Sequence, residues 1–108
     1  MSTCNWPLGN GQELECHIYD TNTNWNNVAG VYIFAYRINP THWHALYVGK
    51  AVDFKTRPMP PSHERWNEAI RLGATHIHAA VVPQAAMREK LEEMLIQTLQ
   101  PEMNVQLR

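Results

Sequence analysis

Three short runs of β-branched and aromatic residues form the clearest pattern of hydrophobic positions along the chain. They cover residues 30–38 (GVYIFAYRI), 45–49 (ALYVG) and 75–82 (THIHAAVV). Such runs, bounded by turn-forming residues, are typical of β-strands. Residues 39–44 (NPTHWH) connect the first two runs, so we predict a hairpin with a rather long loop.

Hydrophobic residues spaced by three and four predict helices around these strands. Residues 52–57 fit a short helix that the following prolines would end. Ser62 is a plausible N-cap for a second helix, and Gly73 is a natural stop for it. The longest predicted helix opens near Pro83 and closes before Pro101. Its predicted buried stripe consists of Met87, Leu91, Met94, Leu95 and Thr98.

The predicted order of elements is β-β-α-α-β-α, which gives an α/β fold: a small three-stranded, mostly antiparallel sheet flanked by helices. Residues 1–28 stand apart because they are rich in Asn, Thr and Gly, the residues of turns. Within them, Leu14 to Tyr19 is either a short strand or a short helix. We therefore expect an N-terminal arm over residues 1–28, anchored by Trp6 and Trp25 on a domain of residues 29–108.

Composition and charge narrow the function classes. The 108 residues suit one domain, and 44% hydrophobic with 18% charged residues is enough for a compact core. A net charge of −1 excludes binding to nucleic acid through bulk positive charge, so any such contact needs a local cluster. Cys4 and Cys16 lack a zinc-ligand pattern and are expected to be reduced thiols. With no secretory signal and no apolar run of ~20 residues, we expect a cytoplasmic protein without a membrane partner.

Five short motifs occur in an order that resembles a known family. They are Gly30-Val31-Tyr32, Tyr47-Val48-Gly49-Lys50-Ala51, the group Asp53, Lys55 and Arg57, then Glu92 with Leu95-Ile96, and finally Pro101 with Asn104. Together they resemble the GIY-YIG endonuclease superfamily, and in particular the N-terminal nuclease domain of the bacterial nucleotide-excision-repair incision subunit. The resemblance covers residues 30–104, about the size of the family's catalytic core.

The resemblance implies a DNA endonuclease that uses one divalent ion, Mg²⁺ or Mn²⁺, held chiefly by a glutamate and water. Glu92 matches that metal ligand. Magnesium suits such a site because it keeps most of its water shell and needs few carboxylates. Helical geometry independently separates Glu92 from its neighbour: Glu92 falls at the edge of the predicted buried stripe, whereas Glu93 points away from it.

The remaining roles also follow from the resemblance. Tyr47 matches the general base, Tyr32 would hydrogen-bond beside it, and Asn104 would act as a structural or substrate-orienting amide. A phenol has a pKa near ~10, so we expect positive charge from Lys50 and Arg57 to lower the Tyr47 pKa. Arg57 would also clamp the phosphate. The predicted substrate-binding residues are Gly49, Lys55 and His63.

One departure from the family pattern concerns a His or Tyr that usually follows the arginine by about four residues. Pro61 stands there in this chain, and His63 two positions later either substitutes for it or leaves the role vacant. The departure and the near-neutral charge favour a rival hypothesis: a catalytically weak or inactive module that binds DNA or a protein partner. A third hypothesis is a nuclease subunit, or a homodimer, that depends on its partner for DNA specificity.

Simpler interpretations remain for single residues. The two tyrosines alone would be core aromatics, Glu92 alone would pair with Arg88 one helical turn earlier, and Asn104 would cap the chain end.

Overall fold

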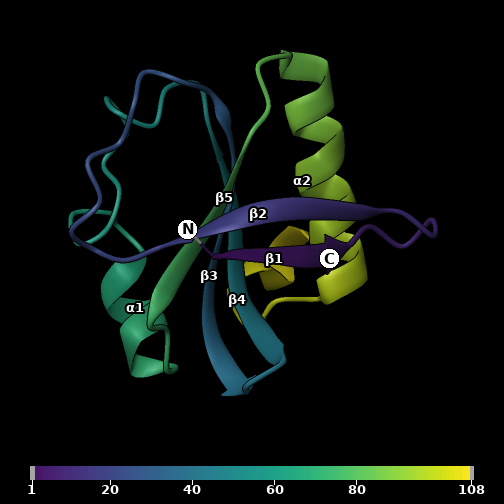
Figure 1. Ribbon diagram of the computed structural model, residues 1–108, viewed down its shortest axis with the longest axis horizontal. Coiled ribbons are helices and arrows are strands. Elements are labelled where there is room, and N and C mark those ends of the chain that lie inside the picture. The colour runs from purple at the N-terminus through teal and green to yellow at the C-terminus, as the bar shows by residue number, and fades with distance from the viewer. Residues whose placement is uncertain (1, 108) are drawn as a thin grey trace.

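The computed structural model describes residues 2–107, apart from the side chains of residues 106 and 107. Figure 1 shows a central sheet with α1 on one side and α2 on the other. The elements, in chain order, are β1 (Thr3–Pro7), β2 (Glu13–Tyr19), β3 (Gly30–Asn39), β4 (His42–Ala51), α1 (Trp66–Arg71), β5 (His76–Val81), α2 (Ala85–Leu99) and the 3-10 helix η1 (Glu102–Leu107).

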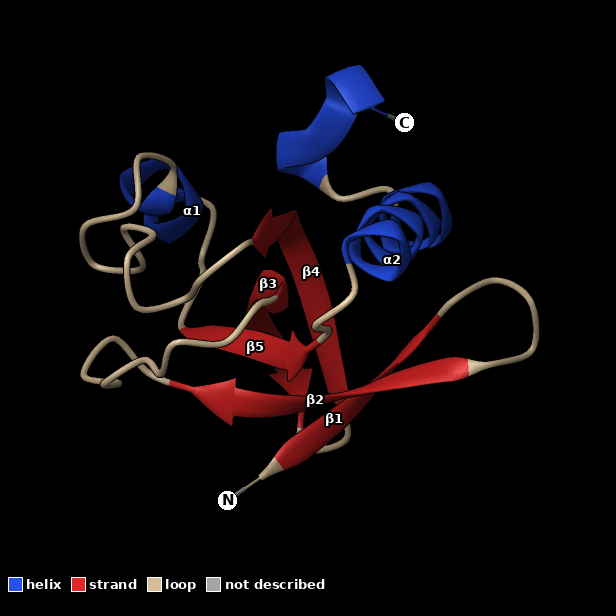
Figure 2. Ribbon diagram, turned by 90° about the horizontal axis from the view of Figure 1, so that it is seen from above, coloured by secondary structure: helices blue, strands red, loops and turns tan. Residues whose placement is uncertain are grey.

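All five strands belong to one antiparallel sheet with the order β1-β2-β5-β3-β4. The sheet curls toward α2 and forms a half-barrel, with the β1–β2 hairpin crossing beneath the helix (Figure 2). The expected α/β fold, a three-stranded sheet flanked by helices, is therefore wrong. The sheet has two additional strands, and α2, with 15 residues, is the only described helix longer than six residues.

The two additional strands come from the residues expected to form an N-terminal arm. Apolar side chains alternate there with polar ones, and Trp6 and Cys16 point inward and are buried. Gly9 and Gly11 adopt positive φ angles of 83° and 85°, which suits the turn between the strands. β2 then pairs with β5, so residues of the expected arm complete the sheet. In β1 the alternation was concealed because Thr3 and Asn5, which are turn-forming types, occupy exposed positions, whereas in β2 the exposed residues are Glu13, Glu15 and His17.

The three strands predicted from hydrophobic runs are confirmed as β3, β4 and β5, although β4 begins inside the expected loop. The predicted helix over residues 52–57 is wrong. That segment is a turn, in which the carboxylate of Asp53 accepts a hydrogen bond from the Lys55 amide at 2.9 Å. Ser62 is not a helix cap either, because α1 begins only at Trp66 and has no side-chain cap.

The long helix forms where it was predicted, and Leu91, Met94 and Leu95 of the expected stripe pack against the sheet, but the stripe differs at two positions. Arg88, Leu95 and Ile96 are its buried residues, whereas Met87 is 45% exposed and Thr98 is exposed. The expected stripe is thus wrong at Met87 and Thr98. Among the described residues, no helix is both long and apolar enough to cross a membrane.

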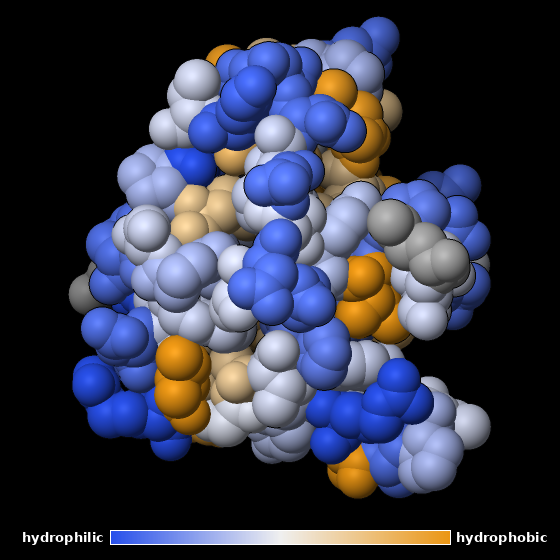
Figure 3. All heavy atoms as spheres, turned by 60° about the vertical axis from the view of Figure 1, so that its left-hand side comes forward, coloured by the Kyte–Doolittle hydropathy of each residue, from blue (hydrophilic) through white to orange (hydrophobic). Residues whose placement is uncertain are grey.

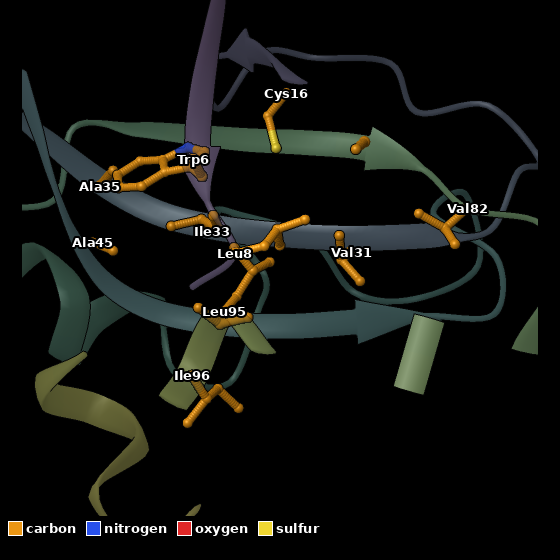
Figure 4. Packing of buried hydrophobic residues seen from close by; sticks show 12 residues of the cluster. Trp6, Leu8, Cys16, Val31, Ile33, Ala35, Ala45, Val82, Leu95 and Ile96 are labelled. Carbon is orange, nitrogen blue, oxygen red and sulfur yellow. The ribbon is translucent and has the colours of Figure 1, made fainter. Parts of the chain in front are cut away.

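Two hydrophobic clusters lie on opposite faces of the sheet. The first fills the concave face under α2 and joins Ile33 and Val31 to Leu95 and to Trp6 of the hairpin (Figure 4). The second lies on the α1 side and includes Tyr32 and Phe34, which alternate with the residues of the first cluster along β3. Residues 30–35 of β3 are buried on both faces, so the side chains of this part of the strand are held rigidly.

A β-bulge in β4 changes which face its residues present. Ala45 pairs with Ala35 and Tyr47 pairs with Phe34, so Leu46 has no partner on β3. Leu46 and Tyr47 consequently both pack on the α1 side, whereas Ala45 belongs to the cluster under α2. Strict alternation from Ala45 would have turned Tyr47 toward α2. The bulge therefore places Tyr47 on the same face as Tyr32.

Candidate active site

Tyr32 is the centre of a hydrogen-bonded cluster on the α1 side of the sheet. The residue is fully buried, and its hydroxyl oxygen lies 3.0 Å from Arg57 Nε and 2.8 Å from His63 Nε2. Arg57 Nη2 extends the cluster to Glu64 at 3.1 Å. Burial is the main cause that raises the pKa of Tyr32 well above its ordinary value, and the nearby Tyr47 adds to the increase. Arg57 opposes it. Tyr32 is therefore a neutral phenol that holds Arg57 and His63 in place.

His63 is buried against Tyr32 and Arg57. The Arg65 amide donates a hydrogen bond to His63 Nδ1 at 3.0 Å, and His63 Nε2 lies 2.8 Å from the Tyr32 hydroxyl oxygen and 3.1 Å from Arg57 Nη2. Burial lowers the pKa of His63 to about 4, against the opposing effect of Glu64. His63 is thus a buried, neutral ring in contact with both Tyr32 and Arg57, whereas Pro61 is exposed.

Tyr47 lies next to this cluster and is half-buried. Its ring centroid is 6.2 Å from that of Tyr32 and 5.7 Å from that of His63, and the guanidinium of Arg65 lies 5.3 Å from its centre. Burial raises the pKa of Tyr47, and the nearby Arg57 and Arg65 only partly offset this effect. The expectation that neighbouring cations lower the Tyr47 pKa is therefore wrong for the free protein.

Lys50 does not flank Tyr47, because residues three apart on a strand point to opposite faces. Its ammonium group lies on the α2 side, where it pairs with Glu89 and lies 3.3 Å from Glu92 Oε1. The hydrogen bond to Glu89 raises the pKa of Lys50. Lys50 is therefore a partner of the helix carboxylates, and the positive charges beside Tyr47 come from Arg57 and Arg65.

Glu92 and Glu93 differ as their positions on the helix predicted. The side chain of Glu92 is 19% exposed at the margin of α2, whereas Glu93 is exposed. The alternative pairing of Glu92 with Arg88 is wrong, because the buried Arg88 guanidinium donates to the carbonyl oxygens of Val82 and Pro83. Glu92 is close enough to raise the Tyr47 pKa through its charge.

The described residues contain no group of three or more His, Cys, Asp or Glu side chains that would hold a metal ion together. Glu92 fits the other kind of site, in which one carboxylate holds a hydrated Mg²⁺ or Mn²⁺ ion. It is partly exposed, and its only ion-pair partner within the described chain is Lys50. A divalent ion at Glu92 would compete with the Lys50 ammonium for the same carboxylate.

Asn104 has a structural role at the exposed edge of the sheet. Its side-chain Oδ1 accepts a hydrogen bond from the Val48 amide at 2.8 Å, and its Nδ2 donates to the Val48 carbonyl at 3.0 Å. The side-chain amide thus pairs with β4 as a neighbouring strand would. Because it satisfies both backbone groups between Tyr47 and Gly49, it fixes the backbone that carries Tyr47.

Two residues predicted to bind substrate lie in different surroundings. Gly49 is buried under Tyr32, and a Cβ atom at this position would come within 2.4 Å of Tyr32 Cζ. The glycine therefore makes room for the Tyr32 ring. This packing alone explains why residue 49 is a glycine, without the expected approach of a phosphate. Lys55 is exposed in a groove next to the cluster and is not part of the tyrosine cluster itself.

Arg65 and Glu64 belong to the site but were not expected there. Arg65 Nη2 donates to the Met103 carbonyl at 3.2 Å, which connects the tyrosine cluster to η1. The sequence points to them only through their position, because both directly follow the predicted site residue His63 in the stretch SHER. Nothing in the sequence predicted the bulge at Leu46, because an extra strand residue has no distinctive composition.

The candidate site therefore lies at the β4 edge of the sheet. Tyr32, Tyr47, Arg57 and His63 are on one face, and Lys50 with Glu92 is on the other. Comparison with family models, curated proteins and solved structures finds no significant match. The resemblance to the GIY-YIG superfamily therefore depends on the matching residues alone.

Proposed function

We propose that this protein is a metal-dependent endonuclease of the GIY-YIG type that hydrolyses phosphodiester bonds in DNA. The observation that carries the proposal is the contact of Tyr32 with Arg57 and His63, residues 25 and 31 positions away along the chain. Tyr47 adjoins these groups, and Glu92 is within electrostatic reach of it. Any buried hydroxyl needs hydrogen-bond partners, but the partners of Tyr32 are two residues that the family resemblance places in the site.

Arg57 is the residue best suited to the phosphate. Its side chain is 28% exposed, and the bond from Nε to the buried Tyr32 hydroxyl fixes its direction. Nη2 bonds to Glu64, an exposed carboxylate that a phosphate oxygen would replace. A guanidinium held in this way stabilises the negative charge that develops on the phosphate oxygens in the transition state of hydrolysis.

Tyr47 would hold the attacking water and accept its proton. In the free protein its pKa is raised by burial, so the neutral phenol predominates at neutral pH. Only the charges of Arg57 and Arg65 favour the phenolate, and both lie beside the ring. This balance predicts slow cleavage that becomes faster as the pH rises.

Glu92 would hold the divalent ion. Magnesium or manganese bound there supplies a Lewis acid for the phosphate and the leaving oxygen. Lys50 would then remain paired with Glu89, so its charge stays neutralised when Glu92 changes partner.

The decisive experiment compares Glu92→Ala with Glu93→Ala. Single-stranded, duplex and branched DNA are incubated with the wild type and each variant, with Mg²⁺, with Mn²⁺, and with a chelator. We expect cleavage that requires the ion, is lost in Glu92→Ala, and is retained in the matched Glu93→Ala variant. The two residues are adjacent on α2, so helix propensity and charge change equally.

Thermal unfolding of both variants accompanies the assay, since a destabilised helix would also remove activity. Equal cleavage by the two variants would exclude Glu92 as the metal ligand. Absence of cleavage by the wild type on all three DNA forms, with either ion, would refute the nuclease proposal.

A second candidate function is a binding module that holds DNA or a protein partner without cutting it. Two observations favour it: the raised Tyr47 pKa and the ion pair that engages Glu92. The cleavage assay above separates the two functions, because a binding module would cut none of the three DNA forms with either ion.

We infer that the protein acts in the cytoplasm, where its two free cysteines would stay reduced. A homodimer or a protein partner would supply the DNA affinity that a chain with a net charge of −1 lacks.

A further inference from the structure

A groove with a volume of about 590 Å³ adjoins the candidate site. One wall is the loop after β2, around Trp25, and the other is the segment from Phe54 to Ser62 that includes Arg57. This loop side of the molecule faces the viewer in Figure 3, where the surface is mostly hydrophilic and hydrophobic residues appear only in scattered places. Arg57 belongs both to the groove and to the tyrosine cluster, so the two are continuous.

The charge of the groove is opposite to that of the whole chain. Lys55 and Arg57 line it, and no Asp or Glu is among the lining residues. The nearest carboxylates are already engaged: Asp53 accepts hydrogen bonds from Asn27 and the Lys55 amide, and Glu64 accepts one from Arg57. A chain with a net charge of −1 thus presents two cations together in one concave surface, which favours a ligand with repeated negative charges.

The other lining groups suit a nucleotide chain. Asn24, Asn26 and Thr21 line the groove, and the structure gives their side chains no hydrogen-bond partner in the described chain. Amide and hydroxyl groups of this kind contact phosphates, sugars and base edges. The partly exposed Trp25 supplies aromatic surface, and its Nε1 has no hydrogen-bond acceptor among the described residues.

The volume of the groove suits a small segment of a chain. At about 590 Å³ it lies within the range of about 300–1,000 Å³ that accommodates drug-sized molecules. The proline-rich wall over residues 58–61 confines it on one side. We expect an unpaired strand to reach Arg57 with its backbone along Lys55, whereas a duplex keeps its bases paired and would present only phosphates to the groove.

We propose that this groove binds a single-stranded segment of DNA directly beside the phosphate to be cut. The inference rests on the proposed nuclease function and specifies its substrate: DNA with an unpaired strand next to the scissile bond. Lys55 and Arg57 neutralise successive phosphates, while the amides and Trp25 contact the bases without a strong sequence preference.

The test measures DNA binding by fluorescence anisotropy in the full chain carrying Glu92→Ala, so that cleavage does not interfere. The probe is a labelled oligo(dT) of about twelve nucleotides, compared with a duplex of equal length. Lys55→Glu reverses the charge of the groove. Lys90→Glu makes the same change on the exposed side of α2, across the sheet, and is the matched control. Circular dichroism verifies that both variants are folded.

We expect oligo(dT) to bind more tightly than the duplex, with a slope of log affinity against log salt of about −1.4 for two phosphates. Lys55→Glu should weaken binding at least about fivefold and reduce the slope by about 0.7, whereas Lys90→Glu should change the affinity less than about twofold. Equal effects of the two variants, or equal affinity for the single strand and the duplex, would overturn the proposal.

Cleavage by the wild-type active site separates this inference from the nuclease proposal. If no DNA form is cut but Lys55→Glu selectively weakens oligo(dT) binding, the groove stands and the nuclease function is wrong. If DNA is cut but Lys55→Glu binds and cuts as the wild type does, the nuclease stands and the groove is not its substrate site.

Discussion

Lowering the pH should destabilise this protein through two buried histidines on opposite faces of the sheet. His63 is 4% exposed in the tyrosine cluster, and His78 is fully buried beneath the β1–β2 hairpin. His78 Nδ1 accepts a hydrogen bond from Trp6 Nε1 at 3.0 Å, so its neutral ring carries the proton on Nε2. Glu64 Oε2 lies 3.6 Å from His63 Nδ1, but Glu64 is exposed and its charge offsets burial only in part. Within residues 2–107, no carboxylate forms an ion pair with His78.

The magnitude follows from the pKa values. Burial is the main cause that lowers both histidine pKa values to about 4, whereas an unfolded chain has a histidine pKa of about 6.5. Below pH ~6.5 the unfolded chain therefore takes up protons that the folded protein does not, so stability is complete above ~6.5 and is lost down to ~4. Between about pH 7.5 and 5 this amounts to about 2 kcal/mol for each ring and about 4 kcal/mol for both.

Urea unfolding of the wild type, His63→Gln and His78→Gln across this pH range measures the effect. Each variant should lose only about half as much unfolding free energy as the wild type between about pH 7.5 and 5, since one titrating ring remains. His42→Gln, at an exposed position, is the matched control and should retain the wild-type loss. Remaining above about pH 5 keeps the lowered pKa values of Asp53, Glu64 and Glu89 from contributing.

The reasoning would be refuted by a wild-type unfolding free energy that stays constant over this range. It would also be refuted if both variants kept the full wild-type loss, because the protons would then be taken up elsewhere. A loss of about 4 kcal/mol is a large part of the ~5–15 kcal/mol that usually stabilises a domain, so the effect lies well above experimental error.

Three further predictions concern the candidate site. Tyr47→Phe should lower the cleavage rate by ~10²–10⁴-fold while leaving the thermal unfolding midpoint nearly unchanged; a variant that cuts as fast as the wild type would show that the hydroxyl is not the base. Asn104→Ala should lower the unfolding free energy by about 2–4 kcal/mol in urea, because it leaves the Val48 amide and carbonyl unpaired; a loss below about 1 kcal/mol would contradict the structural role. Gly49→Ala should cost about 1–3 kcal/mol in the same assay, since the new Cβ would lie 2.4 Å from Tyr32 Cζ; unchanged stability would mean that the Tyr32 ring shifts freely.

The sequence predicted those elements whose hydrophobic signal is local. β3 reads as an unbroken run from Gly30 to Ile38, and α2 lies between two prolines, so neither depended on distant contacts. The β1–β2 hairpin was not predicted: residues 14–19 fitted a strand or a helix equally, and Asn and Thr at the exposed positions of β1 read as turn residues. Its strands form because Trp6 and Cys16 find partners in the cluster under α2, and that information is tertiary.

For the site, residue identity was easier to predict than orientation. Tyr32, Arg57 and His63 are in contact, and Glu92 differs from Glu93 as helical periodicity indicated. The surroundings of Lys50 were not predicted, because they depend on which face of β4 it occupies. The direction of the Tyr47 pKa shift was also wrong, since burial is invisible in the sequence and here outweighs the charges of two arginines.

The single unpaired residue Leu46 determines how this site can be transplanted or redesigned. Tyr47 and Val48 present their side chains to the faces described above only because an extra residue precedes them. A designer who grafted this tripeptide onto a regular hairpin would find the tyrosine on the wrong side unless residue 46 were carried along. Deleting one residue from the strand would interchange the surroundings of Tyr47 and Lys50 at once, although neither residue would itself have been mutated.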